Sequence, residues 1–208
     1  MRCTRRLNGY FQRSVLALLL ALLTVACAPR VWNEPLGVAA SAPAYSLIQK
    51  LPQKNSRKIF TILAFSGGGM RSAAFSYGTL KALQETEVVI KGEKRPLLGE
   101  VDVITAVSGG SYTAAYYGLF GERIFLDYEE KFLRKNIENR FLLSLADPAN
   151  LSGILSEDFN RSDVSALWLS ENIFAGKTFS DMSVGELPFV IINASDINNG
   201  LPFPFVQQ

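Results

Sequence analysis

Three short apolar runs recur along the chain, and each has the pattern of a strand that is buried on both faces of a parallel sheet. They cover residues 59–66 (I-F-T-I-L-A-F-S), 101–107 (V-D-V-I-T-A-V) and 189–194 (F-V-I-I-N-A). Helical patterns follow the first two runs, and residues 127–140 and 162–174 also have the charge pattern or apolar spacing of helices. This order predicts a three-layer α/β domain, in which helices lie on both faces of a mostly parallel sheet.

Two glycine-rich turns connect the first two strands to the helices that follow them. Gly67, Gly68 and Gly69 come after the first strand, and Ser108 comes after the second and is followed by two more glycines. About thirty residues and one helix separate the two strands, which is the length of a connection between parallel strands. Because parallel strands end at the same edge of a sheet, we expect the three glycines to face Ser108 there.

This arrangement suits acyl transfer. A serine at a sharp turn between a strand and a helix exposes its hydroxyl, so Ser108 is the candidate nucleophile. Three successive glycines can direct their N–H groups toward one point and form an oxyanion hole. The alternatives are that Ser108 only caps a helix, and that Gly67, Gly68 and Gly69 form a plain tight turn or a phosphate-binding loop. The usual spacings of phosphate-binding loops are not met.

The composition narrows the possible chemistry. The 208 residues include no histidine, so this chain cannot supply the imidazole of a Ser-His-Asp or Cys-His mechanism. Four of the 21 basic residues precede residue 27, which leaves 17 basic against 19 acidic residues in the rest of the chain. We therefore expect no nucleic-acid partner, because a basic surface stripe is not indicated.

The first 27 residues have the pattern of an export signal. Arginines precede an apolar run at residues 15–26, which is short for a membrane-spanning helix. Residues 22–27 (L-L-T-V-A-C) resemble the lipobox of bacterial lipoproteins, although Thr24 stands where leucine is usual. We expect export across the inner membrane and a lipid anchor on Cys27 at the periplasmic side; the alternative is ordinary secretion. Residues 28–58 are rich in Pro, Ala and Ser and predict a linker before a domain at residues 59–208.

The two turn motifs together resemble those of the patatin-like phospholipases. That family combines a Gly-Gly-Gly-x-Arg/Lys oxyanion loop with a Gly-x-Ser-x-Gly nucleophile turn and uses a Ser-Asp dyad. Here residues 67–71 are G-G-G-M-R and residues 106–110 are A-V-S-G-G, with Ala106 in place of the first glycine. Later segments are similar too, namely 158–163 (D-F-N-R-S-D), 176–179 (G-K-T-F) and 187–200, so the resemblance covers about residues 59–205.

The resemblance implies hydrolysis of an acyl ester, with a phospholipid or another acyl-ester lipid as substrate and without a metal or an organic cofactor. It assigns the nucleophile to Ser108 and the oxyanion hole to Gly67, Gly68 and Gly69. Arg71 would anchor the glycine loop or contact a lipid phosphate, although a purely structural role is also open.

The aspartate of the dyad is absent from the expected motif. The family carries it in Asp-Gly-Gly or Asp-Gly-Ala after the strand at residues 188–194, and this chain contains no Asp-Gly dipeptide. We therefore expect the chain to be the amino-terminal portion of such an enzyme. Asp196 is the least unfavourable substitute, because it follows a strand at the edge of the sheet. Two other functions stay open: a non-catalytic pseudoenzyme or lipid-surface binding module, and a phosphate- or nucleotide-binding α/β protein.

Overall fold

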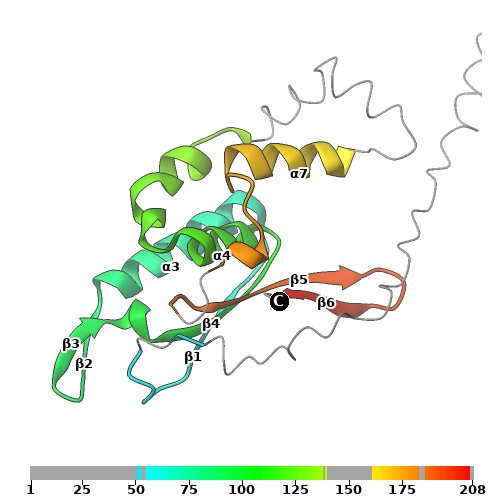
Figure 1. Cartoon of the computed structure of the whole chain (residues 1–208). Coiled ribbons are helices and arrows are strands. Elements are labelled where there is room, and N and C mark those ends of the chain that lie inside the picture. The colour runs from blue at the N-terminus through cyan, green and yellow to red at the C-terminus, as the bar shows by residue number, and fades with distance from the viewer. Residues whose placement is uncertain (1–50, 53–54, 138, 140–160, 183–185, 207–208) are drawn as a thin grey trace, which may run out of the picture.

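The central element of the computed structural model is a four-stranded sheet with the order β1-β4-β5-β6 (Figure 1). The structure describes residues 51–52, 55–137, 139, 161–182 and 186–206. Strands β1 (Thr61–Phe65), β4 (Val101–Val107) and β5 (Phe189–Asp196) are parallel, and β6 (Leu201–Val206) joins β5 antiparallel. The predicted α/β class with a mostly parallel sheet is confirmed, and the three predicted strands lie where the apolar runs are.

Strand β6 is an element that its sequence pattern did not indicate. Its two prolines, Pro202 and Pro204, lie opposite Ser195 and Asn193 of β5. Since the prolines alternate, both lack an N–H on the same side of the strand, which an edge strand tolerates. The side chains of β6 are largely exposed.

The helices come between the strands in chain order. They are α3 (Gly69–Glu85), η1 (Leu97–Glu100), α4 (Gly109–Phe120), η2 (Gly121–Arg123), the π-helix η3 (Ile124–Leu133), α7 (Arg161–Asn172) and η4 (Phe179–Asp181). A small hairpin of β2 (Glu87–Ile90) and β3 (Glu93–Pro96) follows α3. None of the helices in the described ranges has the length and apolar character of a membrane span.

One face of the sheet carries the helices. Helix α4 packs on β4 and β5, and α3 packs against α4 (Figure 1). Ile104 and Val190 of the sheet join the core cluster of these helices, whereas Ile62 is 54% exposed and Val107 is 40% exposed. The sequence predicted helices on both faces of the sheet. In the described part of the chain, no helix covers the face that carries Ile62 and Val107.

The π-helix η3 supplies large side chains to the core. Its buried residues Ile124, Tyr128 and Phe132 are spaced by four and share one side of the helix. The ring of Tyr128 lies 4.8 Å from that of Tyr116, between ring centroids, and Thr113 Oγ1 lies 3.0 Å from the Tyr128 hydroxyl. The sequence predicted a surface helix at residues 127–140, but the element begins earlier and Phe132 is 1% exposed. Residues 138 and 140 of that prediction lie outside the described residues.

Two buried acids at the start of β4 hold the segment that leads into β1. Glu100 accepts hydrogen bonds from the backbone N–H and the hydroxyl of Ser56, and from Arg95 Nη1 at 3.2 Å. Asp102 accepts hydrogen bonds from Asn55 Nδ2 at 2.6 Å and from the Thr61 N–H at 2.8 Å. We call Glu100 and Asp102 the acid clamp. Its bonds fix where the chain enters the sheet.

Burial acts to raise the pKa of the Glu100 carboxyl, but the hydrogen bonds from Ser56 and Arg95 outweigh it and hold the pKa below its ordinary value of 4.5. A carboxylate with a lowered folded-state pKa stabilises the fold above its unfolded pKa, and this contribution is lost as the pH falls through the folded pKa. We predict that Glu100→Gln lowers the free energy of unfolding at pH 7 by about 1–3 kcal/mol, because a buried partner of Arg95 loses its charge. Urea denaturation measures this change.

The matched control is Glu93→Gln, which removes the other carboxylate bound to Arg95 from an exposed position. It should change the free energy of unfolding by less than about 0.5 kcal/mol. The difference in stability between wild type and Glu100→Gln should shrink as the pH falls below about 4.5. Equal stability of the two Gln variants at pH 7 would contradict the prediction.

Candidate active site

Ser108 stands at the turn between β4 and α4 with an unusual backbone. Its φ of 52° and ψ of −124° lie in a region that residues other than glycine rarely adopt. Such a backbone costs on the order of 1–3 kcal/mol and persists only where the surroundings enforce it. The residue is exposed and occupies the N-cap position of α4, but its side chain makes no capping hydrogen bond. The interpretation of Ser108 as a simple helix cap therefore finds no support in the geometry.

The two glycines after Ser108 allow the turn to pack against the chain that follows β1. A Cβ built on Gly109 would lie 2.0 Å from the carbonyl oxygen of Gly69. A Cβ on Gly110 would lie 2.7 Å from the Cβ of Phe65 and 2.9 Å from the carbonyl oxygen of Ser66. Contacts under 3.0 Å with backbone atoms leave no room for a side chain, so only glycine fits these two positions.

The glycine loop lies beside Ser108, as the parallel register requires. Phe65 pairs with Ala106, and the two strands then lead to Gly67 and Ser108 respectively. A Cβ on Gly67 would lie 3.3 Å from the Cβ and 3.9 Å from the hydroxyl oxygen of Ser108. The structure thus brings together two residues that are 41 positions apart in the sequence.

Two glycines with positive φ angles and one serine hydrogen bond set the conformation of the glycine loop. Gly68 has φ 142° and is the N-cap of α3, and Gly69 has φ 62°. The hydroxyl of the buried Ser72 donates a hydrogen bond to the carbonyl of Ser66 and so ties the start of α3 to the end of β1. Sequence reasoning missed this role of Ser72. A polar residue on the buried side of the first helical turn was the available signal.

Both helices present an uncompensated amino end at this edge of the sheet. The first turns of α3 and α4 contain no acidic residue. The partial positive charge of a helix amino end, about half an elementary charge, therefore stays available to an anion. Arg71 lies in the first turn of α3 and is exposed, so it adds a positive charge near the same edge. This electrostatic setting favours negative charge that forms close to Ser108.

The carboxylates of Asp196 and Asp102 are engaged elsewhere. Asp196 accepts hydrogen bonds from Asn199 Nδ2 at 2.6 Å and the Asn198 N–H at 2.9 Å, which lower its pKa. A lowered pKa makes a carboxylate a weaker base, so the interpretation of Asp196 as a substitute base loses support. Asp102 lies in the acid clamp at the start of β4. In the part of the chain that the structure describes, no carboxylate hydrogen-bonds the Ser108 hydroxyl.

Asp127 and the segment at residues 176–179 form hydrogen bonds that stabilise the fold. Asp127 binds the Tyr116 hydroxyl at 2.5 Å, and it also pairs with Arg123 and Lys131. Thr178, in the segment at residues 176–179, forms a capping box with Asp181 at the start of η4. Asp147, Asp158 and the export signal with Cys27 lie outside the described residues.

Asn193 of β5 holds the end of β4, next to Ser108. The sequence did not single out this residue. It pairs with Val107, and its Nδ2 donates to Thr105 Oγ1 at 2.8 Å and to the Ala106 carbonyl at 3.1 Å. These hydrogen bonds join β5 to the carboxyl end of β4, close to Ser108. The signal was a single amide in the apolar run at residues 189–194.

An apolar cavity of about 270 Å³ opens beside the glycine loop. Gly69 and Met70 line it at the start of α3, and Tyr112 lines it one helical turn after Ser108. Its remaining walls come from η3, the residues just after it, and α7: Phe132, Ile137, Ser165, Trp168 and Leu169. Among the described residues that line it, none has a charged side chain, and we call it the loop-side cavity.

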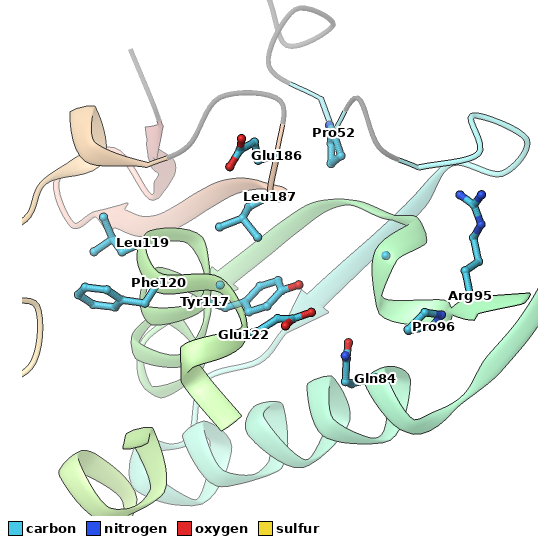
Figure 2. A pocket seen from close by; sticks show the side chains of 12 residues that line it. Pro52, Gln84, Arg95, Pro96, Tyr117, Leu119, Phe120, Glu122, Glu186 and Leu187 are labelled. Carbon is cyan, nitrogen blue, oxygen red and sulfur yellow. The ribbon is translucent and has the colours of Figure 1, made fainter. Parts of the chain in front are cut away.

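A larger cavity of about 510 Å³ lies at the opposite edge of the sheet (Figure 2). Figure 2 shows Tyr117, Glu122 and Leu187 on one side of it and Arg95 on the other. Gly99, just before β4, also lines it, whereas Ser108 follows the end of β4. Seven strand residues span roughly 23 Å, so this cavity takes no part in chemistry at Ser108.

Two solved structures of human GIVD cytosolic phospholipase A2, both in complex with methyl gamma-linolenyl fluorophosphonate and one also with terbium chloride, resemble the chain. The sequence identities are 20% and 21%, and the TM-scores are 0.45 and 0.42. The matches cover 70% and 72% of this chain but only 22% and 23% of the phospholipase, so the chain spans less than a quarter of that protein.

No curated protein matches the chain. The family model described as Patatin-like phospholipase matches residues 63–200, more than half of the sequence. The matched range contains the end of β1, the glycine loop, β4 and Ser108. The chain belongs to the patatin-like phospholipase family.

Proposed function

We propose that the chain carries the nucleophile and the oxyanion loop of a lipid acyl hydrolase, with Ser108 as nucleophile. The observation that carries the proposal is the contact between the exposed, backbone-strained Ser108 and Gly67 at the carboxyl edge of the sheet. Membership of the patatin-like phospholipase family supports a lipid ester as the substrate class.

The proposed reaction has two halves. In the first, a base removes the hydroxyl proton of Ser108, and the oxygen forms a bond to the ester carbonyl carbon. The carbonyl oxygen becomes an oxyanion, which the N–H groups of Gly67, Gly68 and Gly69 and the amino ends of α3 and α4 stabilise. The carbon–oxygen bond to the alcohol then breaks, and the alcohol takes the proton from the base. In the second half, water attacks the acyl-serine in the same way and releases the fatty acid.

The proposed base is an aspartate, as in the Ser-Asp dyad of the family. The Asp-Gly motif that carries this residue in the family does not occur in the 208 residues. Asp196 is a poor replacement, because Asn198 and Asn199 hold its oxygens and lower its pKa. We therefore propose that the 208-residue chain alone reacts slowly at Ser108. We assign Arg71 to the phosphate of a phospholipid substrate, because it is exposed beside the glycine loop.

Labelling with an alkyl fluorophosphonate tests the nucleophile directly. We predict slow, stoichiometric labelling of the 208-residue protein at Ser108, located by peptide mass spectrometry, and no labelling of Ser108→Ala. Ser111→Ala is the matched control, since this serine lies in the first turn of α4 and its buried hydroxyl has no hydrogen-bond partner in the described structure. The control should be labelled like wild type.

Three outcomes would contradict the proposal in different ways. Label that persists in Ser108→Ala would show that another residue is the nucleophile. A complete lack of labelling would favour the non-catalytic lipid-binding alternative. Rapid labelling of wild type would show that a working base exists in the 208 residues.

The oxyanion loop has its own test. We predict that Gly67→Ala slows fluorophosphonate labelling by about 10²-fold, because its Cβ would lie 3.3 Å from the Cβ of Ser108 and displace the loop. Gly78→Ala is the matched control, since a Cβ there meets nothing within 4 Å. That variant should be labelled at the wild-type rate and be slightly more stable, as alanine favours a helix. Equal labelling rates for both variants would contradict the assigned role of the loop.

We also propose that Cys27 attaches the protein to a membrane after export. This proposal comes from the sequence of residues 22–27, which resembles a lipobox. We predict that bacteria expressing the full chain incorporate an alkyne-tagged palmitate into it, and that Cys27→Ser abolishes the incorporation because the thiol that would receive the lipid is removed. Cys3→Ser is the control and should leave the label unchanged. Label that survives Cys27→Ser would contradict the proposal.

A further inference from the structure

The cavity of about 510 Å³ lies at the amino ends of the strands, at the edge of the sheet opposite Ser108 (Figure 2). We call it the amino-edge cavity. Its volume falls within the range of small-molecule sites, roughly 300–1,000 Å³. The reaction proposed for Ser108 does not use this space, so the chemistry of its walls decides which ligand it can hold.

A buried tyrosine hydroxyl is directed into the amino-edge cavity. Tyr117, in the last turn of α4, is 5% exposed and lines the cavity. Figure 2 shows its hydroxyl pointing into the same space as the side chains of Glu122 and Gln84. Within the described part of the chain, this hydroxyl has no hydrogen-bond partner. Since buried hydroxyl groups are normally hydrogen-bonded, a ligand atom in the cavity would complete its bonding.

The tyrosine hydroxyl stays neutral in these surroundings. Burial, and to a smaller extent the negative charge of Glu122, raise the pKa of Tyr117 to about 12. At pH 7 the hydroxyl therefore keeps its proton and offers a ligand both a donor and an acceptor.

The uncompensated charge of the cavity walls is negative. The carboxylates of Glu122 and Glu186 line the cavity and form no ion pair with other residues that the structure describes. Arg95 is the one cation among the described lining residues. It is bound by the carboxylates of Glu93 at 2.8 Å and Glu100 at 3.2 Å, so its charge is already compensated. The walls therefore favour a cation over an anion.

The carboxyl end of α4 adds to this preference. Phe120 and Gly121 line the cavity where the helix ends, and no basic residue lies in its last turn. A helix carboxyl end carries about half an elementary negative charge. Arg123 follows in the chain, but it pairs with Asp127 at 2.8 Å and is not among the described residues that line the cavity. A cation held near Glu122 thus also interacts favourably with the helix end.

Apolar side chains complete the cavity. Leu119, Phe120 and Leu187 line it and are partly buried against the core. An inorganic cation would gain nothing from these side chains, whereas an apolar group gains free energy by leaving water. The cavity therefore suits a ligand with a charged end and an apolar end.

We propose that the amino-edge cavity binds a small organic cation, namely a protonated amine that carries an apolar or aromatic group. The ammonium group donates a hydrogen bond to the Tyr117 hydroxyl and lies next to the Glu122 carboxylate. The apolar group packs on Leu119, Phe120 and Leu187. This inference is independent of the proposed function of Ser108.

Isothermal titration calorimetry of the 208-residue protein with phenethylamine at pH 7 tests the charge preference. Phenethylamine should bind saturably at a single site. The anion 3-phenylpropionate has a similar shape and should bind about tenfold more weakly or worse, because it meets Glu122 and the end of α4 with the wrong charge. Absence of saturable phenethylamine binding, or equal affinities for the two compounds, would overturn the proposal.

A pair of carboxylate variants locates the binding site. Glu122→Gln should weaken phenethylamine binding by about tenfold, because the charge beside the ammonium group is removed. Glu171→Gln is the matched control, since it removes an exposed carboxylate of α7 that is not among the described lining residues, and its affinity should equal that of wild type. Equal affinities in the two variants would place the amine outside the amino-edge cavity and overturn the proposal.

A second pair of variants tests the hydroxyl without changing the charge. Tyr117→Phe should weaken phenethylamine binding by about three- to tenfold, because one hydrogen bond to the ammonium group is lost. Tyr112→Phe removes a hydroxyl from the same helix at the other cavity and should leave the affinity unchanged. Circular dichroism establishes that the variants are folded. A wild-type affinity in Tyr117→Phe would overturn the assigned role of this hydroxyl.

Failure of the proposed reaction is read separately. Ser108→Ala should bind phenethylamine as wild type does, while it loses the fluorophosphonate label. If the wild-type protein binds the amine but is never labelled, the cavity assignment is supported and the proposed nucleophile is wrong.

Discussion

The contact between the Gly109 turn and the Gly69 carbonyl is the constraint on which the site depends. Two strand-to-helix turns meet there backbone against backbone, at a separation that excludes any side chain. This approach places Gly67 beside Ser108 and lets the amino ends of α3 and α4 share one edge of the sheet. A bulky residue at Gly109 or Gly110 would separate the turns and with them the proposed nucleophile and oxyanion loop.

The rest of the sheet supports this contact from both ends. Asn193 bonds β5 to the last residues of β4, just below Ser108. The acid clamp of Glu100 and Asp102 fixes the chain where β1 begins, at the opposite edge. With both ends of the strands held, the unfavourable backbone of Ser108 is enforced by the fold around it rather than by a capping bond of its own.

Helices η3 and α7 have a different role, since they bury little of the sheet and instead enclose space. Phe132 of η3 is buried, and Trp168 and Leu169 of α7 pack against the core while leaving the loop-side cavity between them. The turn places Ser108 beside the glycine loop, and the two helices line the apolar cavity next to Gly69.

The sequence by itself determined the strands, because continuous β-branched and apolar runs such as residues 101–107 fit a doubly buried strand and little else. It also determined the pairing of the Gly67 loop with Ser108, since parallel strands end at one edge. It did not indicate β6, the acid clamp, the hydrogen bond of Ser72 or the burial of Phe132. Those features depend on partners that lie far away along the chain, such as Asn55 for Asp102 and Tyr116 for the π-helix. Only the tertiary structure decided them, because the local sequence pattern shows whether a residue is polar or apolar but not which distant residue it will contact.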